Sequence, residues 1–168
     1  TRQAAAAAVL DALKGTASIF FVVIGAVLLT RFMALSGVPV FLTDVMGAAG
    51  TSQLLVVFLA FAVYLVLGMF LDPLGLLLLT LPIMLPVFEA ARIDMVWMGI
   101  LIVKFVEIGL MTPPVGLNVY AVKTLVGKEA SIETIFRGVM WFLIVDIFVT
   151  IVLILVPEIT LFLPRLMS

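Results

Sequence analysis

The sequence Gly109-Leu-Met-Thr-Pro-Pro-Val-Gly-Leu-Asn-Val-Tyr120 interrupts an apolar segment that otherwise spans residues 95–126. Pro113 and Pro114 have no backbone N–H, and each disfavours the helical conformation of the residue before it, so a helix must break near Thr112. The break leaves carbonyl groups without helical partners. At membrane depth such groups persist only where they are buried in protein or line a wet cavity, and in transporters that place holds a cation or a polar substrate.

The composition is that of an integral membrane protein. Of the 168 residues, 65% are hydrophobic and 11% are charged, and the mean hydropathy is +1.43, whereas a soluble domain has about 25% charged residues. The apolar runs are too numerous and too long for a signal peptide. The absence of Cys and His removes disulfides, thiol and imidazole catalysis and the commonest transition-metal ligands. A net charge of −1 without a basic tract argues against nucleic acid as a partner.

We expect an all-α integral membrane chain that forms a single membrane domain over residues 1–168. The predicted elements are a transmembrane helix at 16–36, an interfacial connector at 37–50, a re-entrant hairpin at 52–88, a broken helix at 95–126 and a transmembrane helix at 134–156. The alanine-rich start, 1–14, suits a helix end or connector more than a span. The second hairpin arm, 74–88, would be only about 22 Å long at 1.5 Å per residue, short of the ~30 Å hydrocarbon core. A hairpin with both ends on one side of the lipid bilayer therefore fits better than two full spans.

The predicted tip of this hairpin is Gly68-Met-Phe-Leu-Asp72-Pro73. In one interpretation Asp72 caps the following arm, with Pro73 at its first helical position. In the other, the carboxylate lies near a bound ion, because an unpaired carboxylate at the centre of a bilayer costs a few kcal/mol. The two interpretations are compatible.

The break itself offers oxygen ligands. Gly109 and Gly116 permit close approach or a positive φ, while Thr112 and Asn118 supply a hydroxyl and an amide. Oxygen donors of this kind suit a hard cation such as Na⁺. The simplest alternative is a proline kink, which is common in membrane helices, but two adjacent prolines exceed what a kink needs.

Three charged residues interrupt the later apolar segments. Lys104 and Glu107 are three residues apart, which predicts a pair within one helix, although Glu107 is also placed to support the break or a partner helix. Asp146 stands alone in the last span, so it must face protein or water. A coupling-ion site, a proton relay and pairing with another residue all remain open for it.

The basic residues predict the orientation of the chain in the membrane. Arg2, Lys14, Lys123, Lys128 and Arg137 fall on one side of the predicted topology, and Arg31, Arg92 and Arg165 fall on the other. The excess puts the first side in the cytoplasm, so we expect the hairpin to open toward the outside.

These motifs resemble the C-terminal part, the second inverted repeat, of the DctM-like large membrane subunit of TRAP (tripartite ATP-independent periplasmic) transporters. The residues that carry the resemblance are Gly68-x-x-x-Asp72-Pro73, Pro82-x-x-x-Pro86, Gly99 and the stretch from Glu107 to Asn118. The resemblance implies a sodium-driven importer of organic acids, such as C4-dicarboxylates or sialic-acid-like carboxylates. It also implies an elevator motion and a place in the bacterial or archaeal inner membrane.

The resemblance also implies which residues bind the ion and substrate. We expect Gly68, Asp72, Gly109, Thr112, Pro113, Pro114, Gly116 and Asn118 at or near that site, with Na⁺ close to Gly68, Thr112, Pro113 and Gly116. Sodium would be the coupling ion, without an organic cofactor. The implied partners are a small membrane subunit, a periplasmic solute-binding protein and the remainder of the large subunit, its first inverted repeat. We expect a fragment or one half of a larger chain, because no internal copy of the hairpin or break occurs.

Three other functions make different predictions from the same sequence. Another elevator-type anion and sodium symporter, such as a divalent anion or arsenite-type carrier, would be expected to carry different residues at the hairpin tip. An intramembrane aspartyl protease would need Asp72 and Asp146 to share a proton, and no Gly-x-Gly-Asp element surrounds either. A non-transporting structural subunit predicts that Thr112→Ala and Asn118→Ala leave transport intact.

Overall fold

The structure is a computed structural model that describes residues 2–38, 40–41, 44–45 and 52–167. Within those ranges the regular elements are helices, and no strand occurs there. They are α1 (Arg2–Leu35), α3 (Gln53–Gly68), α4 (Pro73–Ala90), α5 (Met95–Met111), α6 (Leu117–Val126), α7 (Ile132–Leu155) and α8 (Glu158–Met167). The connector predicted at 37–50 lies mostly outside the described residues, so it stays a prediction.

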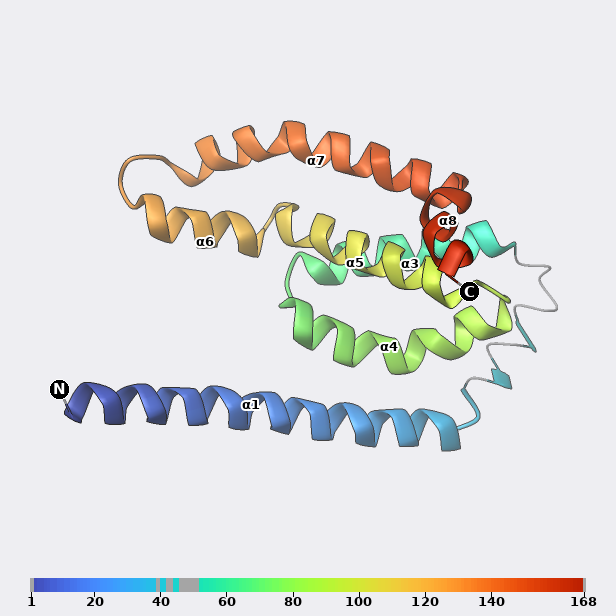
Figure 1. Cartoon of the computed structure of the whole chain (residues 1–168), viewed down its shortest axis with the longest axis horizontal. Coiled ribbons are helices and arrows are strands. Elements are labelled where there is room, and N and C mark those ends of the chain that lie inside the picture. Colours follow the sequence, from blue (N-terminus) through green and yellow to red (C-terminus); the bar gives the residue numbers. More distant parts are fainter. Residues whose placement is uncertain (1, 39, 42–43, 46–51, 168) are drawn as a thin grey trace.

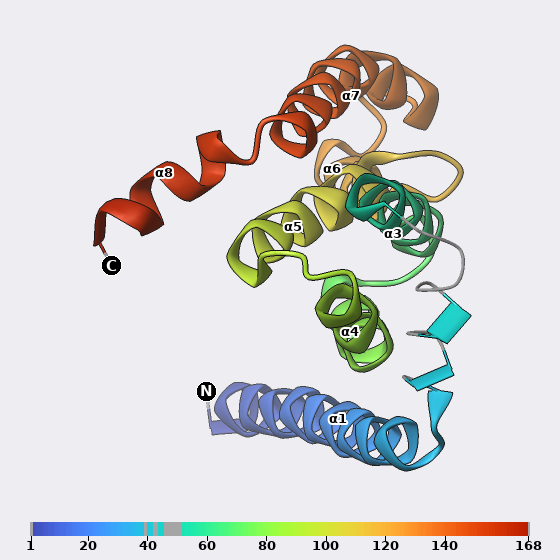
Figure 2. The ribbon, with the colours of Figure 1, turned by 90° about the vertical axis from the view of Figure 1, so that its right-hand side faces the viewer.

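Helix α5 is the centre of the described fold. It packs against α3, α4, α6, α7 and α8, and nine of its 17 residues are buried, against five in α3. Figure 1 shows α7 lying along α6 and then α5, with α3 beside α5 and α4 on the outer side of that pair. Helix α1 runs along α4 at the edge of the molecule, as the turned view in Figure 2 also shows. The residues that surround α5 therefore form the core of the chain.

Three described helical segments are long and apolar enough to cross a membrane. They are Ala6–Met33 within α1, Pro73–Ala90 and Ile132–Leu155. The apolar window within Ala6–Met33 has no buried residue, so this helix presents large side chains such as Phe21, which is 79% exposed, to its surroundings. A continuous apolar surface of this kind is stable only in contact with lipid or protein. The chain is thus an all-α, multi-pass membrane protein.

Helix α1 is longer than the span predicted at 16–36. It begins at Arg2, so the alanine-rich segment predicted as a helix end or connector continues the same helix. The cause is local: alanine has the highest helix propensity, and neither Gly nor Pro occurs before Gly15. The prediction placed a boundary where the polarity changes, but the backbone follows helix propensity.

Helices α3 and α4 form a helical hairpin whose open end is tied together. The Gln53 side chain at the start of α3 donates through Nε2 to the carbonyls of Ala91 and Arg92 at the end of α4, at 3.1 and 3.0 Å. Figure 1 shows this open end at one end of α5 and the hairpin turn about halfway along the molecule. Both ends of the hairpin therefore lie on the same side of the fold.

A buried hydrogen bond joins the two hairpin arms between the turn and the open end. The Oγ1 of Thr80 lies 2.8 Å from the Tyr64 hydroxyl and 2.8 Å from the Leu76 carbonyl. A carbonyl only accepts, so Thr80 gives its single proton to Leu76 and Tyr64 donates to Thr80. Both side chains are at most 4% exposed. The hydrogen bond thus holds the arms together inside the core.

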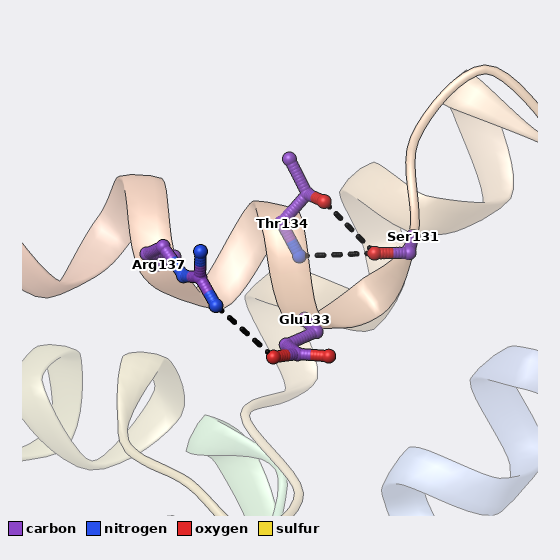
Figure 3. A network of polar contacts seen from close by, with 4 residues as sticks. All are labelled: Ser131, Glu133, Thr134 and Arg137. Atoms are coloured by element: carbon purple, nitrogen blue, oxygen red, sulfur yellow. Dashed lines mark hydrogen bonds and ion pairs between the residues drawn. The ribbon is translucent and has the colours of Figure 1, made fainter.

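The start of α7 is built from exposed polar contacts (Figure 3). Ser131 caps the helix, because its Oγ accepts a hydrogen bond from the Thr134 backbone N–H at 3.1 Å. One turn later Arg137 Nη2 lies 3.1 Å from Glu133 Oε1, and both side chains are 81% exposed. A serine cap and a first-turn acidic residue are favourable at a helix N-terminus. These contacts fix where α7 begins after the loop from α6.

Candidate ion and substrate site at the hairpin tip and helix break

The break after α5 leaves specific carbonyl groups unpaired. Thr112 donates its backbone N–H to Gly109 at 3.1 Å and its hydroxyl to the Ile108 carbonyl at 2.6 Å. The Leu110 carbonyl would receive a helical hydrogen bond from residue 113 or 114, and both are prolines, joined by a cis peptide bond. Within the described residues neither the Leu110 carbonyl nor that of Met111 accepts a hydrogen bond. Two main-chain oxygens are therefore available at the break.

Gly116 restarts the helix with a conformation that other residues rarely adopt. Its φ is +60°, in the left-handed region. A Cβ at this position would lie 2.8 Å from the ring of Phe136 on α7, nearer than real Cβ contacts. The positive φ favours glycine here, and a larger residue would also have to displace the Phe136 ring, so Gly116 sets the angle at which α6 leaves the break.

The hairpin tip leaves a second group of carbonyls unpaired. Helix α3 ends at Gly68, and the backbone N–H groups of residues 69–71 bond back to Leu65 and Leu67. The carbonyls of residues 68–71 accept no hydrogen bond within the described part of the chain. Asp72 Oδ1 accepts from the backbone N–H groups of Leu74 and Gly75 at 3.1 and 3.0 Å. The predicted capping role of Asp72, with Pro73 at the first helical position, is confirmed.

Gly68 and Gly109 bring the tip and the break together. A Cβ on Gly109 would lie 2.9 Å from the Gly68 Cα and 3.2 Å from the Tyr64 carbonyl oxygen, so the two backbones are in direct contact. Only glycine at both positions allows two helices to approach this closely. Figure 1 shows the turn between α3 and α4 beside the junction of α5 and α6. The unpaired carbonyls of the tip begin at Gly68, and those of Leu110 and Met111 directly follow its contact residue Gly109 in the chain.

The other predicted site residues are less directly involved in that contact. Asp72 is exposed, and its Oδ1 faces the start of its own helix, α4. Asn118 lies in the first turn of α6 with an exposed side chain that forms no hydrogen bond to the described residues. Pro113 and Pro114 are exposed at the break. The structure thus joins Gly68 to Gly109 and leaves Asp72 and Asn118 at the edges of the junction.

An ion pair between α5 and α7 is the polar feature that the sequence left open. Lys104 Nζ lies 2.8 Å from Glu107 Oε2 and 2.6 Å from Asp146 Oδ1. The predicted Lys104–Glu107 pair is confirmed, and of the alternatives for Asp146 the structure shows pairing with another residue. Asp146 Oδ2 and the Thr150 hydroxyl are buried without a hydrogen-bond partner in the described part. The pair could have been proposed from the sequence, because Lys104 is a basic residue in one apolar helix and Asp146 is an acidic residue in another.

The chemistry of the junction suits an alkali cation better than a transition metal. Among the described residues no group of three or more Asp, Glu, His or Cys side chains is placed to hold a metal. The available ligands are carbonyl oxygens and the Thr112 hydroxyl, whose oxygen keeps its lone pairs after donating to Ile108. Neutral oxygen ligands of this type suit a hard cation.

These features define an all-α membrane protein in which a helical hairpin meets a helix interrupted by two prolines. A family model described as the tripartite ATP-independent periplasmic transporter, DctM component, matches residues 1–159. The chain belongs to this family, and it is accordingly a component of a transport protein and not of an enzyme.

Individual relatives cover most of this chain. The C4-dicarboxylate TRAP transporter large permease protein DctM of Vibrio cholerae is 32% identical over 157 residues, which is 94% of this chain and 34% of that protein. The sialic acid TRAP transporter permease protein SiaT of Haemophilus influenzae is 38% identical over 125 residues, 74% of this chain and 20% of that protein. The sialic acid TRAP transporter large permease protein SiaM of Vibrio cholerae is 32% identical over 157 residues, which is 93% of this chain and 36% of that protein.

The chain therefore spans about a third of the length of the large permeases it resembles, and less of the longer SiaT. No solved structure matches it.

Proposed function

We propose that this chain forms the part of a TRAP permease that binds sodium and an organic acid between its hairpin tip and its helix break. The observation that supports the proposal is the contact between Gly68 and Gly109, because unpaired carbonyls adjoin each of these two residues in the chain. Unpaired carbonyls inside a membrane protein are the usual ligands of a coupling ion. Sodium coupling is the part of the proposal that most needs a direct test.

Sodium would bind to main-chain oxygens from the tip and the break together. The candidate ligands are carbonyls of residues 68–71, those of Leu110 and Met111, and the Thr112 hydroxyl oxygen. Since these oxygens come from two different elements, a bound cation would hold the hairpin against the broken helix. Such a coupling makes the shape of the site depend on the sodium concentration.

The substrate carboxylate would bind at the start of α6. Gly116 caps this helix without a side-chain hydrogen bond, and its carbonyl accepts from the N–H groups of Val119 and Tyr120. The N–H groups of Leu117 and Asn118 remain available, and a helix N-terminus favours negative charge. The start of α4 is already capped by the Asp72 carboxylate, so of the two helix starts at the junction the start of α6 favours an anion.

The hairpin would be re-entrant, with its open end on one side of the membrane and its tip near the middle. In support, Gln53 closes the open end and the turn lies about halfway along the molecule. The complete permease would be an elevator-type importer in the bacterial or archaeal inner membrane. Its partners would be a small membrane subunit and a periplasmic solute-binding protein, and its substrates would be carboxylates like those that the relatives are named for.

The decisive experiment is solute uptake by the complete transporter in liposomes, with and without an inward sodium gradient. Thr112→Ala removes a proposed oxygen ligand, and Thr112→Ser is the matched control that keeps the hydroxyl. We expect sodium-dependent uptake in the wild type and in Thr112→Ser, and uptake at least tenfold lower in Thr112→Ala. Asn118→Ala should raise the substrate concentration needed for half-maximal uptake.

Equal uptake with and without the gradient in every variant would contradict the sodium proposal. Normal sodium-driven uptake by both Thr112→Ala and Asn118→Ala would instead favour a structural role for this chain.

A further inference from the structure

One strip of the central helix α5 is left open by the other described residues of the chain. Its members are Val96, Gly99, Val103 and Glu107, whose spacing of three or four residues puts them on one face. Val103 is 63% exposed and the Glu107 side chain is 51% exposed, while most of the remaining positions of α5 are buried. In Figure 2 helices α3, α4, α6 and α7 gather on one side of α5, and α8 lies on the other side, at the start of α5. We refer to these four residues as the open strip.

The open strip lies at membrane depth. Trp97 Nε1 donates to the Leu153 carbonyl at 2.9 Å, and Lys104 pairs with Asp146. Seven residues separate the two contacts on each helix, so α5 and α7 run antiparallel in one continuous register. The same register puts Glu107 level with residue 143, at the middle of the apolar helix α7 (Ile132–Leu155).

The charges beside the open strip do not balance. Lys104 carries one positive charge, and it faces two carboxylates, Glu107 and Asp146. Helices α3 and α4 contain no Lys or Arg, and Lys123 of α6 donates to the carbonyls of Gly127 and Ala130. Arg137 of α7 pairs with Glu133, and α8, which carries Arg165, lies at the start of α5, away from Glu107. Among the described residues one negative charge is therefore left over at the centre of the span, where a carboxylate costs about 2.5–3.5 kcal/mol on the most lenient scale.

We propose that the open strip is the docking face for another transmembrane helix that places an Arg or Lys opposite Glu107. The excess negative charge requires a cation, and Val96, Gly99 and Val103 offer an apolar face around it. A Cβ added at Gly99 would meet no atom within 4 Å, so a second backbone has room to approach there. The docking helix would come from the remaining two thirds of a permease like the relatives. This assignment of the helix is the one part of the inference that rests on the proposed function.

Photo-crosslinking in the complete transporter tests this directly. A benzoylphenylalanine at Val103, irradiated in native membranes, should form an adduct that mass spectrometry maps to a transmembrane helix with an Arg or Lys within one turn of the crosslink. Glu107→Lys should lower the adduct yield at least fivefold by charge repulsion, whereas Glu107→Gln should lower it less. Replacing the mapped Arg or Lys by Glu should restore the yield in the Glu107→Lys background.

Accessibility provides the second measurement. The chain contains no cysteine, so Glu107→Cys introduces its single thiol. A water-soluble maleimide should leave this thiol unmodified in intact membranes. Rapid labelling would mean that Glu107 faces an aqueous cavity and would overturn the proposal.

Adducts with lipid alone, or with a helix that lacks a nearby base, would also overturn it. Crosslinking in the expected pattern without sodium-driven uptake would contradict only the sodium proposal, so the two failures can be told apart.

Discussion

The two sides of helix α5 are held in opposite ways. Toward the hairpin, the contact is apolar: the Phe61 ring of α3 packs on Phe105, with ring centroids 4.9 Å apart, and backbone meets backbone at Gly68 and Gly109. Toward α7, the contact includes directional polar bonds, with the Trp97 indole on the Leu153 carbonyl and Lys104 on Asp146. The hairpin side therefore depends on close apolar packing, and the α7 side depends on a hydrogen bond and an ion pair.

This difference indicates what each side can do. A glycine contact without directional bonds changes with small shifts of the helices, and it lies where the unpaired carbonyls are. An ion pair at the middle of a span is costly to separate, so α5 and α7 should move as one body. We therefore expect the contact between α5 and the hairpin to change when an ion binds, and the contact between α5 and α7 to stay rigid.

The largest expected effect is on the α7 side. Lys104→Met leaves Glu107 and Asp146 without their cation, and removing one partner of a buried pair costs about 3–5 kcal/mol. Because the Lys104 and Asp146 side chains are 23% and 19% exposed, we expect the lower end of that range. The measurement is the apparent melting temperature of the purified transporter.

Asp146→Asn is the informative control, because Lys104 then keeps its ion pair with Glu107, at 2.8 Å. It should cost clearly less than Lys104→Met, and the double variant should recover part of the loss. A Lys104→Met protein as stable as the wild type would remove the distinction between the two sides.

The next effect is on the hairpin side. Gly109→Ala puts a methyl group 2.9 Å from the Gly68 Cα and 3.2 Å from the Tyr64 carbonyl, where only backbone is available to move. Overpacking of this kind costs about 1–3 kcal/mol, and the displaced hairpin should also impair uptake. Gly138→Ala on α7 is the matched control, because its Cβ would meet nothing within 4 Å. Equal melting temperatures and uptake for the two variants would contradict the close contact.

A smaller effect is expected inside the hairpin. Tyr64→Phe removes the hydroxyl that donates to Thr80, which leaves a buried acceptor without one partner and costs about 1 kcal/mol. Since this bond joins the two arms, hydrogen exchange should become faster in both α3 and α4. Faster exchange in α3 alone would show that the arms are not coupled through Tyr64.

The smallest effect concerns the second ion pair of α7. Arg137→Ala removes the contact with Glu133, but both side chains are 81% exposed, so the loss should be below about 0.5 kcal/mol. The same melting-temperature measurement provides the comparison with Lys104→Met. A loss as large as that of Lys104→Met would show that burial does not distinguish the two pairs.

Local rules explain which parts of the structure the sequence predicted. Two prolines end a helix wherever they occur, and an Asp before Pro at a turn caps the next helix, so the break at Thr112 and the role of Asp72 followed from their neighbours. The pairing of Lys104 with Asp146 did not follow, because 42 positions separate them and only the register of α5 on α7 brings them together. The hydrogen bond between Tyr64 and Thr80 depends on the same kind of tertiary placement.

The Gly68–Gly109 contact shows which part of a tertiary contact a sequence motif can predict. Gly109 was identified as a position that permits close approach or a positive φ, Gly68 was identified as part of the hairpin tip, and the resemblance to TRAP permeases implied a shared site. That the two backbones touch depends on the crossing of α3 and α5, which no local pattern specifies. Helix α1 begins before the span predicted at 16–36, because local alanine propensity extends the helix past the change in polarity.

The central claim is that main-chain oxygens at the hairpin tip and the break hold sodium. The most direct test is the apparent melting temperature of the purified transporter in sodium chloride and in choline chloride at equal ionic strength, because an ion that binds the folded state raises it. We predict a rise that is specific to sodium in the wild type and in Thr112→Ser, and that is lost in Thr112→Ala. Identical melting curves in sodium and choline for the wild type would contradict the claim.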